Sequence, residues 1–385
     1  MKKKYFIILF LLLGFYSHAQ YTISFVIDSL PSSHGNEAIF VAGNFNSWNP
    51  GNTAFQSSLR GDKQLIKLVL PAGNYEYKFT RGNWGKGEAT ATGAGISNRT
   101  LTVSSDTVIN ISVNGWSDDF AHPERVHTAS KNVSVLDTAF FMPQLNRTRR
   151  IWIYLPQGYA SSSKHYPVLY MHDGQNLFDD LSSGFGEWGV DECLDSLIAK
   201  GSPACIVIGI DNGPKRFNEY NPFDFEKFGA GEGKAYTDFI AHTLKPFIDQ
   251  HYRTATNKES TMIAGSSMGG LISYYAMLQY PEVFGKAGIF SPAFWTAPAI
   301  KGLTDSLSAL QKGRFFFYMG GREGSTYIQD MLDVEEKIGR RTTATVYSII
   351  DDEGAHNEQA WRKWFPEFYQ WIMAEGYSYF IPVKK

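Results

Sequence analysis

Short β-type runs separated by turn residues fill the first part of the chain. Turn signals such as Asn49-Pro50-Gly51 and Ala72-Gly73-Asn74 stand between the runs, and no helical period is present. Several strands at this spacing are typical of two packed antiparallel sheets. The pattern therefore predicts an all-β, immunoglobulin-like sandwich over residues 20–115. The expected strands are residues 21–26, 38–41, 65–70, 75–80, 100–103 and 107–113.

The pattern changes after residue 128, where apolar strands alternate with helix-length amphipathic segments. Within residues 236–248, apolar side chains recur at three- and four-residue steps, which gives a helix one apolar face. Strands that alternate with helical crossovers form a mostly parallel sheet covered on both sides. We therefore expect an α/β domain over residues 129–385, joined to the sandwich by a linker at residues 116–128. The expected strands are 167–172, 205–210, 261–264, 286–290, 314–319 and 343–350, and the other helices are 189–200, 271–279, 327–338 and one starting near Asn357.

The first nineteen residues form a separate segment. A basic tip, Lys2-Lys3-Lys4, precedes an apolar run at residues 5–15 and the small-residue pattern Ser17-His18-Ala19. This arrangement predicts a secretory signal peptide that is cleaved after Ala19. The run is too short for a membrane span, which needs about 20 residues. We expect a periplasmic or secreted protein with no membrane insertion after cleavage.

Composition excludes several classes of protein. Among 385 residues, 36 are Lys or Arg and 38 are Asp or Glu, and no long basic run lies outside the N-terminal tip, so we expect no nucleic-acid partner. Aromatic residues make up 15% of the chain, which excludes intrinsic disorder. Two cysteines, Cys193 and Cys205, are too few for a disulfide scaffold or a zinc cluster of thiolates. A disulfide between them and two free thiols both remain open.

One pentapeptide follows the pattern G-x-S-x-G: Gly265-Ser266-Ser267-Met268-Gly269. Its setting between a predicted strand and a predicted helix is that of a nucleophile elbow. The turn is so tight that side chains at the two glycine positions would clash. The motif therefore predicts an α/β-hydrolase domain with Ser267, not Ser266, as the nucleophile.

Chain order restricts the remaining catalytic groups, because in this fold the acid and then the histidine follow the serine. His356 is the only histidine after Ser267, and it lies on a loop that follows a predicted strand. We predict it as the general base. Glu323 is the favoured acid because it also follows a sheet strand, at the strand end where open α/β sheets present functional groups. Asp330 is the next candidate.

An oxyanion hole should combine two backbone amides. One follows the nucleophile and belongs to Met268, and the other lies after the strand at residues 167–172. Gln175 is our candidate there. His172 and Asp173 precede the nucleophile, so we expect them to shape this loop by hydrogen bonds.

The back domain resembles an esterase family that includes feruloyl and acetylxylan esterases of carbohydrate esterase family one, enterochelin esterases and mycolyltransferase antigens. The likeness covers roughly residues 130–375 in order. It implies a metal-free serine esterase without a cofactor that forms an acyl-enzyme intermediate. The matching segments are Tyr170-Met171-His172-Asp173-Gly174-Gln175-Asn176, residues 265–270, Ser291-Pro292-Ala293-Phe294-Trp295, Gly354-Ala355-His356-Asn357-Glu358 and Trp361-Arg362-Lys363-Trp364-Phe365-Pro366.

Two tryptophans are candidates for contact with substrate. Trp295 follows the strand after the nucleophile helix, and Trp361 begins the helix after His356. We expect both to face the catalytic cleft, where such walls suit a planar or apolar acyl group. Packing of the last helix by Trp361 and Trp364 is an equal alternative.

The front domain resembles the starch- and glycogen-binding modules attached to amylases and to AMP-activated kinase. Residues 41–50 and Tyr75-Glu76-Tyr77-Lys78-Phe79 carry the likeness. It implies that Trp48 and Trp84 are sugar-stacking platforms and that Lys78 and Asn98 contact sugar hydroxyls. A sandwich that docks or shapes substrate without binding a glycan is the alternative.

These observations favour an exported serine esterase that cleaves acetyl or feruloyl esters from a carbohydrate, with an α-glucan or another polysaccharide at the front module. A siderophore hydrolase acting on a catecholate trilactone shares the same catalytic parts. A glycan-binding protein with an inactive hydrolase domain is the candidate from a different class.

Overall fold

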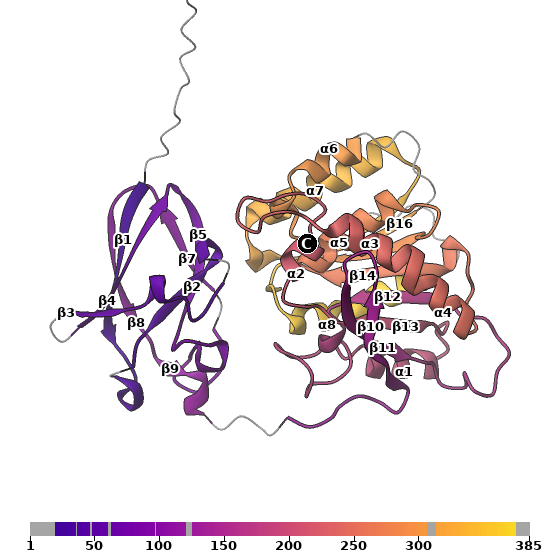
Figure 1. The fold of residues 1–385 in the computed structure, drawn as a ribbon, viewed down its shortest axis with the longest axis horizontal. Helices are drawn as coiled ribbons and strands as arrows, with labels where there is room; N and C mark the ends of the chain where they lie inside the picture. Colours follow the sequence, from indigo (N-terminus) through magenta and orange to yellow (C-terminus); the bar gives the residue numbers. More distant parts are fainter. Residues whose placement is uncertain are drawn as a thin grey trace, which may run out of the picture. The chain divides into compact units, whose positions relative to one another are not determined.

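The structure is a computed structural model that describes residues 20–374, apart from 36, 47, 61–62, 97, 121–124 and 306–312. The predicted signal peptide lies outside the described residues. The chain divides into two compact units, Met1–Pro123 and Glu124–Lys385 (Figure 1).

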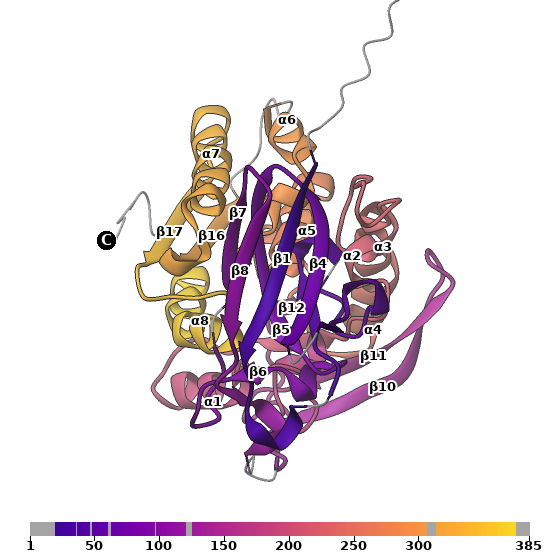
Figure 2. The same cartoon turned by 90° about the vertical axis from the view of Figure 1, so that its left-hand side faces the viewer.

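The first unit is a β-sandwich. Its larger sheet has the order β3-β4-β1-β8, a second sheet has the order β2-β5-β7, and β6 pairs with β9 (Figure 2). Along β1, Ile23, Phe25 and Ile27 alternate with more exposed residues and face the core, as expected for a sheet with one face packed and one solvated. The strands are β1 (Gln20–Ser29), β2 (Phe40–Gly43), β3 (Ser58–Arg60), β4 (Lys63–Pro71), β5 (Gly73–Thr80), β6 (Glu88–Ala89), β7 (Arg99–Val103), β8 (Thr107–Ser112) and β9 (Gly115–Trp116).

The linker that we predicted over residues 116–128 is wrong at both ends. Trp116 pairs with Glu88 and is fully buried in the sandwich core. On the other side, Thr128 and Ser130 are already tied to the second unit, since the Ser130 amide donates to Asp191 at 2.6 Å and the Thr128 hydroxyl donates to Glu187 at 3.0 Å. A composition rich in Gly, Ser and Asp does not reveal that one large side chain within it fills a core.

The second unit is built on an eight-stranded sheet in the order β10-β11-β13-β12-β14-β15-β16-β17. Strands β12 to β17, six in all, run parallel to one another, as predicted. The edge hairpin of β10 and β11 is antiparallel and was not predicted, although β11 ends in a buried apolar run at residues 151–154; in β10, only the last residue is fully buried. The strands are β10 (Val133–Met142), β11 (Arg147–Tyr154), β12 (Val168–His172), β13 (Ile206–Ile210), β14 (Thr261–Ser266), β15 (Lys286–Phe290), β16 (Arg314–Gly320) and β17 (Thr345–Asp351).

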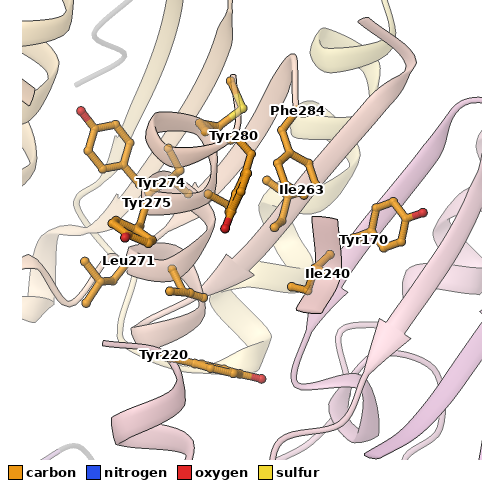
Figure 3. Packing of buried hydrophobic residues seen from close by; sticks show 14 of the residues in the cluster. Tyr170, Tyr220, Ile240, Ile263, Leu271, Tyr274, Tyr275, Tyr280 and Phe284 are labelled. Carbon is orange, nitrogen blue, oxygen red and sulfur yellow. The ribbon is translucent and has the colours of Figure 1, made fainter. Parts of the chain in front are cut away.

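Helices cover both faces of this sheet. Helices α1 and α8 pack on one face, around Leu194 and Phe365. The other face carries α3, α5 and α7, packed around Tyr236, Leu271 and Val334. Figure 3 shows part of this cluster, including Leu271 and Tyr274 of α5. The predicted long helix is continuous from Gly233 to His251 through one π-helical turn, Ile240–Leu244. The helices are α1 (Val190–Ala199), α2 (Arg216–Glu219), α3 (Gly233–Phe239), α4 (Lys245–His251), α5 (Met268–Gln279), α6 (Ala299–Asp305), α7 (Ser325–Arg341) and α8 (Glu358–Met373).

Every strand and helix that the pattern predicted between residues 167 and 373 is present, and together they form an α/β-hydrolase domain. The strand ends differ from the predicted ones by a few residues. In the described part of the chain, no helix is both long and apolar enough to span a bilayer.

Candidate active site

Ser267 stands at a sharp turn between β14 and α5. Its backbone has φ 58° and ψ −120°, a conformation that L residues rarely adopt. A Cβ at Gly265 would lie 2.9 Å from His172, so only glycine fits there, whereas the contact at Gly269 is milder at 3.3 Å. Ser266 is buried at 6% exposure, while Ser267 is partly exposed. The elbow therefore presents Ser267 and hides Ser266.

Glu323 and His356 meet although they are 33 residues apart. The carboxylate Oε2 lies 2.6 Å from the imidazole Nδ1. Glu323 ends the short helix Gly321–Glu323 directly after β16, and His356 lies on the loop between β17 and α8. A carboxylate beside Nδ1 keeps the proton on that nitrogen and leaves Nε2 as the acceptor. This is the arrangement a general base requires.

The competing acid, Asp330, is engaged elsewhere. Its carboxylate accepts a hydrogen bond from Lys301 at 2.8 Å, on the side of α7 that faces α6. Glu323 is therefore the acid that the structure brings to His356.

The loop after β12 is fixed by an ion pair. Asp173 has φ 57° and accepts two hydrogen bonds from Arg216, at 2.7 and 2.8 Å, and one from Asn212 at 2.7 Å. Burial alone would raise the pKa of Asp173, but the Arg216 and Asn212 contacts prevail and hold it below its usual range. Gln175 lies within the helical turn Gly174–Asn176, and its side chain accepts the Asn212 amide at 3.1 Å. The carboxylate thus shapes the loop that carries the predicted oxyanion donor.

Two further titratable side chains lie beside this loop. Burial lowers the pKa of His172 to about 3, so its ring is neutral, and its Nδ1 lies 3.0 Å from the Tyr236 hydroxyl. Burial also raises the pKa of Glu358 to about 7, and the nearby Asp173 adds to this effect. His172 is thus tied to Tyr236 at the end of β12, and Glu358, which the sequence indicated only as part of a matching segment, is affected by the charge of Asp173.

Trp361 does not line the cleft, and the prediction that it contacts substrate is wrong. Its side chain is buried at 4% exposure, its indole N–H donates to Ser291 Oγ at 2.9 Å, and its ring meets His356 edge to face at 5.1 Å. Trp361 therefore packs against the ring of His356, the predicted base. A sequence shows that a tryptophan begins a helix but not which way its side chain points.

Trp295 remains partly exposed on the turn Phe294–Thr296, close to the elbow. Phe225 and Tyr327 pack on it at 5.9 and 6.3 Å between ring centroids. Trp295 was predicted from the sequence, whereas Phe225 was not, since its only signal was the spacing of three phenylalanines within residues 223–228. The three rings form one aromatic cluster.

Met268 is the first residue of α5, directly after Ser267, and its role as an oxyanion donor stays a prediction. Ser291, Asn212 and Arg216 were missed. Each acts through a partner that is distant in sequence, and a single chain carries no signal for such pairings.

The sandwich brings Trp48 and Trp84 together, with ring centroids 6.2 Å apart and planes inclined by 42°. Both are partly exposed. Lys78 is partly buried, which lowers the pKa of its ammonium group, and Asn98 donates its amide to Glu76 at 3.0 Å. The two rings thus form one surface feature, while the Asn98 amide already has a protein partner.

The two cysteines do not form a disulfide. Cys193 and Cys205 are free thiols, and burial raises the pKa of each to about 12. Within the described residues, no cluster of histidine, cysteine, aspartate or glutamate side chains is arranged to hold a metal ion.

Comparison with known proteins agrees with this geometry. The model of the family described as "Putative esterase" matches residues 143–371, more than half of the chain, so the chain belongs to this family. It is a carboxylic ester hydrolase of the α/β-hydrolase fold.

Individual relatives are more distant. The chain is 28% identical over 249 residues to the uncharacterized protein YbbA of Bacillus subtilis, covering 60% of this chain and 94% of YbbA. It is 27% identical over 174 residues to an endo-1,4-beta-xylanase/feruloyl esterase of Xylanibacter ruminicola, covering 44% of this chain and 23% of that protein. The crystal structure of the enterobactin esterase FES from Shigella flexneri shares its fold, with a TM-score of 0.52, 14% identity and 92% of each chain covered.

Proposed function

We propose that this protein is an exported serine esterase that removes acetyl or feruloyl groups from a carbohydrate. Ser267 is the nucleophile, His356 the base and Glu323 the acid. The 2.6 Å contact between Glu323 and His356, together with the strained backbone of Ser267, carries this proposal. The export rests on the sequence of residues 1–19.

The reaction proceeds in two halves. His356 Nε2 takes the hydroxyl proton of Ser267 while Oγ attacks the ester carbonyl, and the Met268 and Gln175 amides stabilise the oxyanion. The imidazolium then gives its proton to the departing sugar oxygen, which leaves the acyl group on Ser267. Water, deprotonated by His356, attacks this acyl-enzyme. The bond between the acyl carbon and Ser267 Oγ then breaks, His356 returns the proton to Oγ, and the carboxylic acid is released.

The test is a pair of variants at the elbow. Ser267→Ala should lower kcat on a nitrophenyl ester by about 10⁴–10⁶-fold with the fold intact, because one triad member is lost. Ser266→Ala is the matched control and should stay within a few-fold of wild type. If Ser267→Ala keeps more than about a tenth of the wild-type turnover, the proposed nucleophile is wrong.

The aromatic cluster around Trp295 supports an aromatic acyl group, as does the feruloyl esterase among the relatives. Trp295→Ala should change the ratio of kcat/KM between feruloyl and acetyl esters by about tenfold, or about 1.4 kcal/mol. An unchanged ratio would remove Trp295 from the acyl site.

A siderophore trilactone is the alternative substrate, supported by the fold shared with the enterobactin esterase. Comparing hydrolysis of a feruloylated sugar, an acetylated sugar and a catecholate trilactone by one preparation separates the two. A protein that hydrolyses none of them but binds a glycan would instead be an inactive hydrolase.

The Trp48 and Trp84 pair supports binding of an α-glucan or another polysaccharide by the sandwich. The double variant Trp48→Ala/Trp84→Ala should lose retention on insoluble starch and keep full hydrolysis of a small soluble ester. Equal retention of the variant and the wild type would leave the sandwich without a glycan role at this pair.

A further inference from the structure

A chain of three hydrogen bonds runs behind the catalytic histidine. The Trp361 indole N–H donates to Ser291 Oγ at 2.9 Å, and the Ser291 hydroxyl donates to Glu323 Oε1 at 2.6 Å. The other carboxylate oxygen, Oε2, contacts His356 Nδ1 at 2.6 Å. The chain joins residues from three separate elements, since Trp361 belongs to α8, Ser291 follows β15 and Glu323 follows β16.

Every part of this chain is buried up to the imidazole. Ser291 is 2% exposed, Trp361 is 4% exposed and the Glu323 side chain is 3% exposed. A buried carboxylate is costly unless its oxygens are hydrogen-bonded. Glu323 meets this need with neutral donors, the Ser291 hydroxyl and the Gly320 amide at 2.8 Å.

Ser291 holds an uncommon backbone conformation for this contact. Its φ is 44°, in the left-handed region that favours glycine. Its own amide donates to Tyr318 O at 2.7 Å, which anchors it to β16. Non-glycine residues with such a backbone angle are concentrated at functional sites.

We propose that Ser291 and Trp361 are positioning residues that fix the Glu323 carboxylate in the orientation in which it holds His356. This inference rests on the proposed triad. Each acts through Glu323, and Trp361 acts twice, because its ring also meets the His356 ring edge to face at 85°. Trp188 packs on the Trp361 ring at 5.7 Å and restricts its movement.

The geometry explains why the hydroxyl matters. With both hydrogen bonds in place, Glu323 Oε1 is fixed and only Oε2 is presented to His356. Without the Ser291 hydroxyl, Oε1 retains the Gly320 amide but loses one of its two donors, so the carboxylate is oriented less firmly. A misplacement of about 1 Å in a catalytic group costs up to about 100-fold in rate.

The test compares variants that remove one hydrogen bond each. Ser291→Gly removes the hydroxyl and suits the left-handed backbone, and Trp361→Phe removes the indole N–H and keeps an aromatic ring. Trp364→Phe is the matched control, because Trp364 lies on the same helix and donates its indole N–H to Asp351 at 2.8 Å, outside the chain. Thermal melting establishes that each variant is folded.

We expect Ser291→Gly to lower kcat by about 10- to 100-fold with KM within about twofold of wild type. Trp361→Phe should lower kcat by a smaller factor, and the double variant should be no slower than Ser291→Gly, because the indole acts through the serine. The His356 Nδ1 proton, which resonates far downfield in NMR when it is shared with a carboxylate, should move in both single variants. In Trp364→Phe, kcat and this resonance should stay as in the wild type.

A Ser291→Gly variant that is folded and keeps wild-type kcat would overturn the inference, as would a loss confined to KM. So would a Trp361→Phe variant that behaves like Trp364→Phe in both measurements. The same preparation series includes Ser267→Ala. An active Ser267→Ala would refute the proposed triad, whereas an inactive Ser267→Ala beside an unaffected Ser291→Gly would refute the positioning role alone.

Discussion

Two buried carboxylates stand at the ends of parallel strands, Asp173 after β12 and Glu323 after β16, and their partners differ. Asp173 is gripped by the permanent cation Arg216 through two hydrogen bonds. Glu323 is held by neutral donors and by an imidazole, which is charged only when protonated.

Under the proposed mechanism, the difference separates a structural carboxylate, Asp173, from a catalytic one, Glu323. The charge of Asp173 is compensated at all times by the guanidinium, so it fixes a loop and does not respond to chemistry nearby. The charge of Glu323 is left for the imidazolium that forms when His356 accepts a proton, which is what the acid of a triad must supply. Asp173 and Glu323 are equally buried, and each follows a parallel strand, so their different roles follow from their different partners.

The largest expected effect sharpens this comparison at Glu323. Glu323→Gln removes the charge with little change of shape, and we expect kcat to fall by about 10³–10⁴-fold. Asp330→Asn, which alters an ion pair with Lys301, should stay within about twofold of the wild type in the same ester assay. The reverse result would transfer the acid role to Asp330.

The second prediction tests whether the ion pair between Asp173 and Arg216 is structural. Arg216→Met leaves a buried carboxylate without its cation, and we expect the free energy of unfolding to fall by about 3–5 kcal/mol in urea titrations. The exposed pair of Arg340 and Glu336 supplies the control, and Arg340→Met should cost less than about 1 kcal/mol.

Removing both charges separates the pair from its surroundings. Asp173→Asn/Arg216→Met should recover part of the lost stability, because no unpaired buried charge remains. A double variant that is less stable than Arg216→Met would contradict the view that the ion pair exists to hold the loop.

The smallest expected effect concerns Glu358, whose pKa is raised by burial and by the charge of Asp173. Its pKa of about 7 in the folded protein lies above the value of about 4.3 expected when unfolded. Folding therefore favours the protonated form, and the associated stability is complete below about pH 4 and is lost as the pH rises through 7. Glu358→Gln should be more stable than wild type by about 2 kcal/mol at pH 8, with no such gain at pH 4. Urea titrations at the two pH values measure this, and a gain of equal size at both would mean that Glu358 does not titrate in this way.

The sequence was informative where a role depends on local order and poor where it depends on distant contacts. Ser267, His356 and Glu323 were predicted from the elbow motif and from their order along the chain, which the fold constrains, and the structure brings Glu323 and His356 into contact. Trp361 was misjudged because side-chain direction follows from packing against Ser291 and Trp188.

Partners were the hardest to predict. Arg216 gave no signal, since its contact with Asp173 spans 43 residues and forms only in the folded sheet. The hairpin of β10 and β11 was also missed: β10 has mostly exposed side chains and little apolar alternation, and the apolar end of β11 was not assigned to a strand. The order of residues along the chain predicts the candidate catalytic groups, whereas the residues that hold them in place are seen only in the folded structure.

The residues of the site are synthesised in a fixed order, and the segment that contains His356 and α8 comes last. His356 and Trp361 follow every other named residue of the site along the chain, apart from their neighbours on the same helix. During synthesis, which adds about 5–20 residues per second, the nucleophile elbow leaves the ribosome several seconds before the residues that activate it. Under the proposed mechanism, a nascent or truncated chain that ends before His356 carries the serine but has no base to activate it, and one that ends before α8 has the base but lacks Trp361, which packs on it. Full hydrolytic activity therefore reports that the loop of His356 and the helix after it have docked, and it measures completed folding of this domain without any added probe.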